Sequence, residues 1–221
     1  MAENDSLRHD IAHRRGHVYA ASRKEEPQVG TAPGGADLLF ASASAVARVV
    51  QDEVTKIFSA QVWAPETPYK FKNRTFRPKS GPLLIYECHI GMAQEEGRVG
   101  TYREFADITL EHVKEAGYNT IQLMAIMEHP YYGSFGYQVS NFYAASSWFG
   151  KPEDLKYLVN KAHSMGIRVL LDLVHSHAVK NTAEGINMFD GTTWQFFHDG
   201  EKGEHPAWGT KCFDYSKTGV L

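Results

Sequence analysis

The chain has 221 residues, 43% of them hydrophobic and 22% charged, which is typical of a globular protein and excludes a disordered or collagen-like chain. Its 23 Lys and Arg against 26 Asp and Glu give a formal net charge of −3 without a long basic run, so we expect neither nucleic acid nor a membrane as a partner. Two distant cysteines, Cys88 and Cys212, exclude a disulfide scaffold and a CxxC zinc site and favour a cytoplasmic location.

Residues 1–45 show no sustained hydrophobic periodicity. They contain prolines, glycines and an Ala/Ser run, so we expect this segment to be a poorly ordered tail. No apolar stretch in the chain approaches the ~20 residues of a membrane span. The first 45 residues therefore predict neither a folded domain nor a membrane anchor.

Two short β-like runs follow, at Val46–Val50 and Ile57–Trp63, separated by the mostly polar Gln51–Lys56. This pattern predicts a hairpin, and the prolines that come after it indicate an extended connector. We therefore expect residues 46–79 to be the end of a small β domain and its connector.

The next two predicted elements are a strand and a helix. Leu83–Tyr86 is an unbroken apolar run of the kind found in a strand that is covered on both faces. A helix is predicted to begin at Thr101, which forms a capping box with Glu104, and to end at Gly117. Apolar residues at helical spacing lie between these ends, and they are Tyr102, Phe105, Ala106, Thr109, Val113 and Ala116.

A second strand is predicted at Thr120–Met124 and a third at Arg168–Val174. Between them, Pro152 suits the first turn of a helix and Gly166 its end. The inward face of this helix is expected to consist of Leu155, Leu158, Val159 and Ala162. This alternation of strands and helices predicts parallel β/α units.

Three such units are compatible with either a doubly wound sheet or a (β/α)8 barrel. The segments after the second strand (residues 125–150) and after the third (residues 175–221) are long and rich in Gly and aromatic residues, as the loops at the carboxyl face of a barrel are. No GxGxxG or GxxxxGK[ST] follows a strand, which disfavours a nucleotide-binding fold. We therefore favour the barrel.

Asp172, His175 and His177 are the first candidates for chemistry, because they cluster at the carboxyl end of the third strand. Three interpretations are open. In the first, Asp172 accepts hydrogen bonds from loop N–H groups and the histidines only pack. In the second, His175 and His177 form an HxH pair that binds a divalent metal. In the third, these residues recognise a sugar.

In the sugar interpretation, aromatic rings cover the apolar face of a pyranose. The loop after the second strand supplies Tyr131, Tyr132, Phe135, Tyr137, Phe142 and Tyr143. Most of these rings are expected to pack within the loop itself. Tyr137, between Gly136 and Gln138, is the ring that we single out as a sugar contact.

Several long motifs resemble the glycogen and starch branching enzymes, a family within the α-amylase superfamily of glycoside hydrolases. In chain order they are QVWAPE at 61–66, LMAIMEH at 123–129, GSFGYQV at 133–139, LDLVHSHA at 171–178 and NMFDG at 187–191. The resemblance extends from about Ala47 to about Tyr215. It implies an incomplete TIM (β/α)8 barrel of about three β/α units over residues 80–221. Residues 46–79 would then be the remnant of a β-sandwich carbohydrate-binding module.

The resemblance also implies roles for individual residues. Asp172 and His177 match the Asp and His that organise the site and hydrogen-bond the reacting sugar, and Tyr137 matches the aromatic residue that stacks on that sugar. The family's Asp nucleophile, Glu general acid and second Asp match no residue here, because they are expected beyond Leu221. Asp190 and Asp214 do not correspond to them.

The implied reaction cleaves an α-1,4-glucosidic bond and transfers the glucan chain to a 6-hydroxyl, forming an α-1,6 branch in glycogen, amylose or amylopectin. It needs two carboxyl groups about 5–5.5 Å apart and no metal or organic cofactor. We therefore expect this chain alone to be inactive. The alternatives are an amylase-type hydrolase, a metal-dependent hydrolase using His175 and His177, and a noncatalytic glucan-binding fragment.

Overall fold

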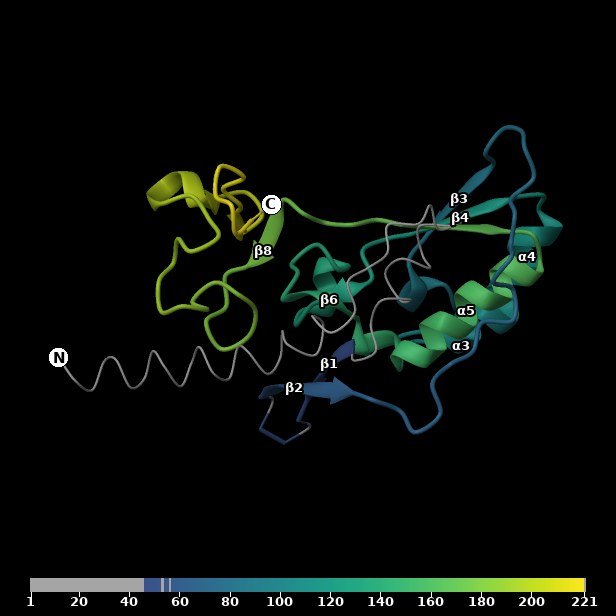
Figure 1. Ribbon diagram of the computed structural model, residues 1–221, viewed down its shortest axis with the longest axis horizontal. Helices are drawn as coiled ribbons and strands as arrows, with labels where there is room; N and C mark the ends of the chain where they lie inside the picture. Colours follow the sequence, from purple (N-terminus) through teal and green to yellow (C-terminus); the bar gives the residue numbers. More distant parts are fainter. Residues whose placement is uncertain (1–45, 53, 56, 221) are drawn as a thin grey trace.

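A computed structural model describes residues 46–220 except Glu53 and Lys56 (Figure 1). The tail expected at residues 1–45 lies outside these described residues. The described part contains a hairpin, a parallel sheet with two helical segments beside it, and a group of loops with short antiparallel strands.

The predicted hairpin is confirmed. Strand β1 (Val46–Gln51) pairs antiparallel with β2 (Phe58–Trp63). In the turn between them, the Asp52 carboxylate accepts the backbone N–H groups of Val54 (3.0 Å) and Thr55 (2.6 Å). The hairpin is attached to the rest of the protein through Trp63, whose indole N–H donates to the Glu153 carboxylate.

The alternation of parallel strands and helices is also confirmed. Strands β3 (Ile85–Cys88), β4 (Thr120–Leu123) and β7 (Arg168–Leu171) form a parallel sheet in the order β3-β4-β7. Figure 1 shows the helical segments α3, α4 and α5 lying together along this sheet. The first strand begins two residues later than the start of the apolar run, because the backbone pairs first at Ile85 and Thr120.

The first predicted helix begins at the expected capping box, in which the Thr101 hydroxyl accepts the Glu104 N–H at 3.2 Å and the Glu104 carboxylate accepts the Thr101 N–H at 2.9 Å. It consists of α3 (Tyr102–Glu104), a π-helical turn η2 (Phe105–Thr109) and α4 (Leu110–Glu115). The helical spacing of the apolar residues did not predict the π-helical turn η2, which is wider than a turn of α-helix. In the structure Leu110 rather than Thr109 is fully buried, and Ala116, expected in the core, is exposed.

The second predicted helix is α5 (Pro152–Ser164), with Pro152 in its first turn as expected. Gly166, with φ of 78°, follows its end in the left-handed region that favours glycine. The four residues predicted for its inward face, Leu155, Leu158, Val159 and Ala162, are all fully buried. They share one core with β4 and the buried face of the first helical segment.

The predicted burial of the first strand is wrong. Leu83 and Leu84 are about half exposed, and Ile85 is 41% exposed. β3 lies at the edge of the described sheet, and the helices of the core lie against one face of that sheet only. The apolar run therefore lacks the second covering layer that its composition predicts.

The remaining strands are short and antiparallel. β5 (Met127–Glu128) pairs with β6 (Asn141–Ala145), and β8 (His177–Val179), β9 (Glu204–His205) and β10 (Thr210–Cys212) form a sheet in the order β8-β10-β9. Short 3₁₀ turns complete the fold: η1 (Ile90–Met92), η3 (Tyr132–Ser134), η4 (Ser147–Phe149) and η5 (Gly200–Gly203). None of the helices in the described residues is long and apolar enough to cross a membrane.

The third parallel strand ends at Leu171, three residues before the predicted end at Val174. Figure 1 shows the chain running on from β7 as an extended segment to β8, which lies apart from the parallel sheet. Asp172 is therefore the first residue after the strand, and His177 belongs to a different sheet.

Candidate functional site

The carboxyl end of the parallel sheet carries a short hydrogen bond between two of the predicted site residues. The Tyr137 hydroxyl donates to Asp172 Oδ2 at 2.6 Å. Asp172 is itself held to the neighbouring strand, because its backbone N–H donates to the Leu123 carbonyl at 3.0 Å. This end of β7 therefore presents a carboxylate and a phenol in one fixed arrangement.

Tyr137 is brought to Asp172 by a tight turn over the end of β4. Gly136 has φ of 91°, and a Cβ atom there would overlap the Ala125 carbonyl oxygen and lie 2.7 Å from Ala125 Cβ. The preceding residue, Phe135, also has a positive φ, of 53°. Only glycine allows this close approach of the two backbones, so the sequence Gly136-Tyr137 places the ring.

The environment of Tyr137 keeps its hydroxyl group protonated. Burial raises the pKa of Tyr137, and the hydrogen bond to the Asp172 carboxylate raises it further. The phenol is therefore a hydrogen-bond donor at neutral pH, and it fixes one carboxylate oxygen of Asp172. The other oxygen, Oδ1, has no hydrogen-bond partner among the described residues and is able to accept one from a ligand.

His177 is surrounded by other polar and aromatic side chains from the β8-β10-β9 sheet. Its Nδ1 atom lies 2.9 Å from the Thr210 hydroxyl, and its ring centroid lies 4.6 Å from that of Trp208 and 5.2 Å from that of His205. Burial lowers the pKa of His177, and the nearby His205 lowers it further. The imidazole is therefore neutral at pH 7.

Trp208 and His205 are further candidate residues beside His177 that the sequence did not indicate. Their rings are stacked, with centroids 4.9 Å apart and an interplanar angle of 29°, and Trp208 is 58% exposed. An exposed indole presents an apolar face of the kind on which a pyranose ring can stack. The sequence feature that could have indicated Trp208 is its place in a turn with Pro and Gly, HPAWG at 205–209. No sequence pattern near that turn connects it with His177.

The segment that carries Tyr137 also connects the two groups of side chains. The Gln138 side-chain amide donates to the Trp208 carbonyl at 3.2 Å, and Val139 forms an isolated parallel bridge with Ala178. The structure thus joins Tyr137 and Asp172 directly. His177 is one residue from the bridged Ala178, and the contacts of its ring are with Thr210, His205 and Trp208.

The other candidates occupy ordinary structural positions. His175 is exposed, and its backbone carbonyl accepts the Tyr215 hydroxyl. Asp190 and Asp214 accept hydrogen bonds within their own turns, from Thr192 and Ser216 respectively. Among residues 46–220, Glu53 and Lys56 aside, no group of three or more His, Cys, Asp or Glu side chains is arranged to hold a metal ion.

The other aromatic residues of the loop follow the expectation only in part: Tyr132 packs within the loop against Phe135 and Trp148, but further ring contacts are made outside it, and Tyr131 is 62% exposed. Tyr132 and Phe135 both form edge contacts with His89, with centroids 5.8 and 5.3 Å from the imidazole. Phe142 packs edge-on against Phe213 at 5.4 Å. Tyr143, by contrast, is 80% exposed.

Comparison with known proteins connects this geometry with one family. The sequence model of the alpha-amylase catalytic domain matches residues 96–217, which is more than half of the chain. The chain is 54% identical over 178 residues to a 1,4-alpha-glucan-branching enzyme of Aspergillus oryzae, a match that covers 80% of this chain and 26% of that protein. It is also 54% identical over 176 residues to the enzyme of the same name from Yarrowia lipolytica, covering 78% of this chain and 25% of that protein.

Among solved structures, the alpha-amylase of Geobacillus thermoleovorans complexed with acarbose superposes with a TM-score of 0.52 at 24% identity, covering 62% of this chain and 34% of that one. At this identity the likeness concerns the fold alone. The chain spans about a quarter of the length of the curated relatives it matches. From the domain match, the parallel sheet and the fold likeness together, the chain belongs to the alpha-amylase family.

Proposed function

We propose that this chain is a segment of a 1,4-alpha-glucan branching enzyme and that it positions the glucan at the carboxyl end of an incomplete (β/α)8 barrel. The observation that carries the proposal is the 2.6 Å hydrogen bond from Tyr137 to Asp172 at that end of the sheet. The 54% identity with proteins named as branching enzymes supports this activity over amylase hydrolysis.

In this proposal the described side chains bind and orient the sugar. Asp172 Oδ1 accepts a sugar hydroxyl while Oδ2 is held by Tyr137, and the Tyr137 ring covers the apolar face of the pyranose. The neutral His177 imidazole hydrogen-bonds a further hydroxyl, and Trp208 beside it stacks on a neighbouring glucose unit. The nucleophile and general acid are supplied by the remainder of the parent enzyme.

The same proposal extends to the rest of the chain and its setting. Residues 46–79, with the β1–β2 hairpin docked on α5 through Trp63, are the end of a β-sandwich glucan-binding module. The substrate is an α-1,4-glucan such as glycogen, amylose or amylopectin. The two cysteines are free thiols, which supports a cytoplasmic location.

A chimera tests the branching activity. The matched 178 residues of this chain replace their counterpart in the Aspergillus oryzae branching enzyme, and amylose is the substrate. Branching lowers the iodine stain without producing new reducing ends, because each cleaved bond is replaced by a branch. We expect this result. A fall in stain with a matching rise in reducing ends would contradict branching and assign the segment to hydrolysis.

A second candidate function, noncatalytic glucan binding, is favoured by the 58% exposure of Trp208 beside His177. The 221-residue chain is tested for retardation in amylose-containing native gels, with Trp208→Ala and Tyr143→Ala, a variant of the exposed tyrosine of β6, as a matched pair. Retardation that Trp208→Ala alone abolishes supports glucan binding by the isolated chain. Equal retardation of all three proteins would show that the Trp208 surface does not bind amylose.

A further inference from the structure

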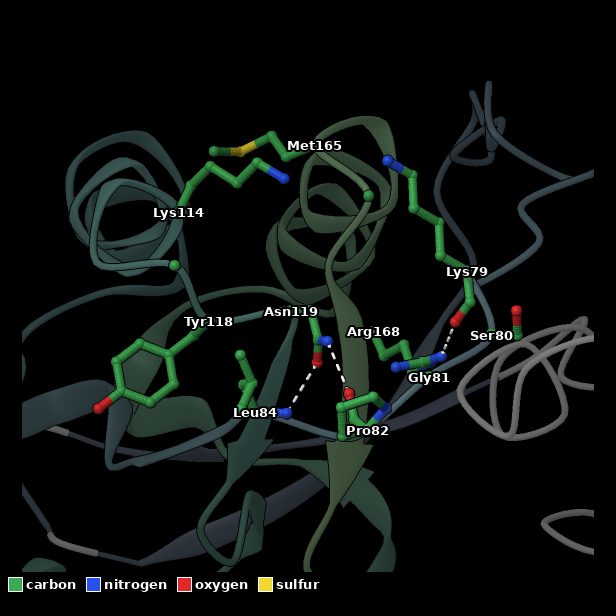
Figure 2. A pocket seen from close by; sticks show the side chains of 12 residues that line it. Lys79, Ser80, Gly81, Pro82, Leu84, Lys114, Tyr118, Asn119, Met165 and Arg168 are labelled. Carbon is green, nitrogen blue, oxygen red and sulfur yellow. Dashed lines mark hydrogen bonds between the residues drawn. The ribbon is translucent and has the colours of Figure 1, made fainter.

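A cavity lies at the amino end of the parallel sheet, opposite the Tyr137–Asp172 pair. Its volume is about 370 Å³, and its lining includes Leu84, Asn119 and Arg168, which lie at the amino ends of β3, β4 and β7 (Figure 2). Asp172 and Tyr137 lie at the carboxyl end of the same sheet, so this cavity is separate from the glucan site proposed above.

Asn119 makes the base of this cavity rigid. Its side-chain Oδ1 accepts the Leu84 N–H at 3.0 Å and its Nδ2 donates to the Pro82 carbonyl at 3.0 Å, as Figure 2 shows. Its backbone carbonyl accepts the Arg168 N–H at 2.9 Å. One residue therefore ties together the starts of all three strands, so the backbone at the base of the cavity is held in place before any ligand arrives.

Three cationic side chains from separate segments line the cavity: Lys79 of the connector, Lys114 of α4 and Arg168 of β7. Figure 2 shows the ammonium ends of Lys79 and Lys114 on either side of the Met165 segment and the Arg168 guanidinium next to Gly81. No Asp or Glu lines it, and none of the three cations forms an ion pair within the described part of the chain. The Arg168 guanidinium donates to the Lys79 carbonyl, which leaves its charge uncompensated.

The carboxyl ends of α4 and α5 lie at this cavity, but their negative partial charges do not balance its three cations. Each helix end carries about half a negative charge, so two ends offset about one of the three cations. Their carbonyl groups are largely satisfied by the backbone, since Tyr118 N–H donates to Val113 O at 3.2 Å and Ile167 N–H donates to Ala162 O at 2.9 Å. The excess positive charge remains available to a ligand.

We propose that this cavity binds a small phosphomonoester, such as a sugar phosphate. Two ammonium groups and a guanidinium match the charge and the several acceptor oxygens of a phosphate group. The volume is within the range of small-molecule sites, so the cavity has room for a sugar attached to the phosphate. The proposal does not depend on the branching activity, because it uses none of the residues of the glucan site.

Calorimetric titration tests the proposal on the 221-residue chain, and again on the chimera. The probes are glucose 6-phosphate, inorganic phosphate and uncharged glucose. We expect glucose 6-phosphate to bind at least about tenfold more tightly than glucose, with an affinity that falls as salt is added. Tighter binding of glucose 6-phosphate than of phosphate identifies a sugar phosphate as the ligand; equal binding supports the same anion site with free phosphate as its ligand.

Lys114→Gln removes one charge at the cavity, and Lys202→Gln removes one from an exposed lysine of η5 that does not line it. We expect Lys114→Gln and Lys79→Gln each to weaken glucose 6-phosphate binding by about threefold to tenfold. Lys202→Gln should leave it unchanged, and amylose branching by the chimera should be unaffected by all three. Equal weakening by Lys202→Gln, or no binding in either protein, would overturn the proposed site.

Discussion

At the scale of single residues, the Tyr137–Asp172 pair allows the two contributions proposed for the Tyr137 side chain, a hydrogen bond to Asp172 and ring stacking on the sugar, to be tested separately. Tyr137→Phe removes the 2.6 Å hydrogen bond and keeps the ring, whereas Tyr137→Ala removes both. In the chimera we expect branching to fall by about fivefold to tenfold for Phe, and by about a further tenfold for Ala. The iodine-stain rate on amylose measures both. Equal losses for the two variants would mean that the ring does not stack on the substrate.

Replacing Gly136 by alanine tests the close approach of this residue to Ala125, and Gly191→Ala is the control for the positive φ alone. Gly136→Ala combines a positive φ with overlap of the Ala125 backbone, whereas Gly191→Ala has a similar φ of 89° and open space around its Cβ. We expect Gly191→Ala to cost about 1 kcal/mol of unfolding free energy and Gly136→Ala to cost more, by about 1–3 kcal/mol. Urea unfolding of the 221-residue chain compares the two. Identical costs would show that the loop does not depend on this close approach.

Buried histidines give the chain a predicted dependence of stability on pH. Burial lowers the pKa of His89, and the neighbouring His129 lowers it further; both His89 ring nitrogens lack hydrogen-bond partners among the described residues. Since the unfolded chain binds a proton more readily, the stability that His89 provides is full above its unfolded pKa of about 6.5 and declines below it. The same direction holds for His129 and His177.

His89→Phe tests this pH dependence. The ring lies among Tyr132, Phe135 and Phe149, so a phenyl ring fits the same aromatic contacts without a titrating group. We expect the loss of thermal stability between about pH 7.5 and about pH 5.5 to become smaller in His89→Phe. The exposed His112→Phe serves as control and should retain the full loss. An unchanged pH profile in His89→Phe would contradict the assignment.

At the scale of elements, the sequence predicts the features that depend on local chemistry. The capping box of Thr101 and Glu104, the first-turn Pro152 and the terminating Gly166 all act within a few residues, and each is present in the structure. The buried face of α5 follows from helical spacing alone. Local signals of this kind suffice to place helix ends and to orient a helix on its core.

Features that depend on tertiary partners were not predictable in the same way. The exposure of Leu84 and Ile85 depends on which layers cover the sheet, and the composition of a strand does not report that. Likewise Trp208 reaches His177 through the pairing of β8 with β10, which no pattern near either residue signals. Within the candidate site, family motifs indicated Tyr137, Asp172 and His177, and only the fold reveals their partners.

At the scale of the whole molecule, the exposed apolar side chains of the parallel sheet are the most consequential feature. Ile85 of β3 is 41% exposed and Leu170 of β7 is 36% exposed, next to strand edges that are unpaired among the described residues. Such a surface promotes association and binds hydrophobic dyes. The packed core on the helical side, with Leu158 and Ile121 fully buried, is expected to hold the elements together despite this exposure.

Ile85→Lys tests whether the exposed apolar face of the parallel sheet causes self-association. Because Ile85 is already partly in water, a charge there should reduce dye fluorescence and self-association of the 221-residue chain while its melting temperature stays nearly constant. Leu158→Lys, in the core, should instead abolish the melting transition, because it buries an unpaired charge. In the chimera, where further barrel units are available to cover the sheet, Ile85→Lys should become strongly destabilising. A variant that is harmless in both proteins would show that this strand face never enters a barrel core.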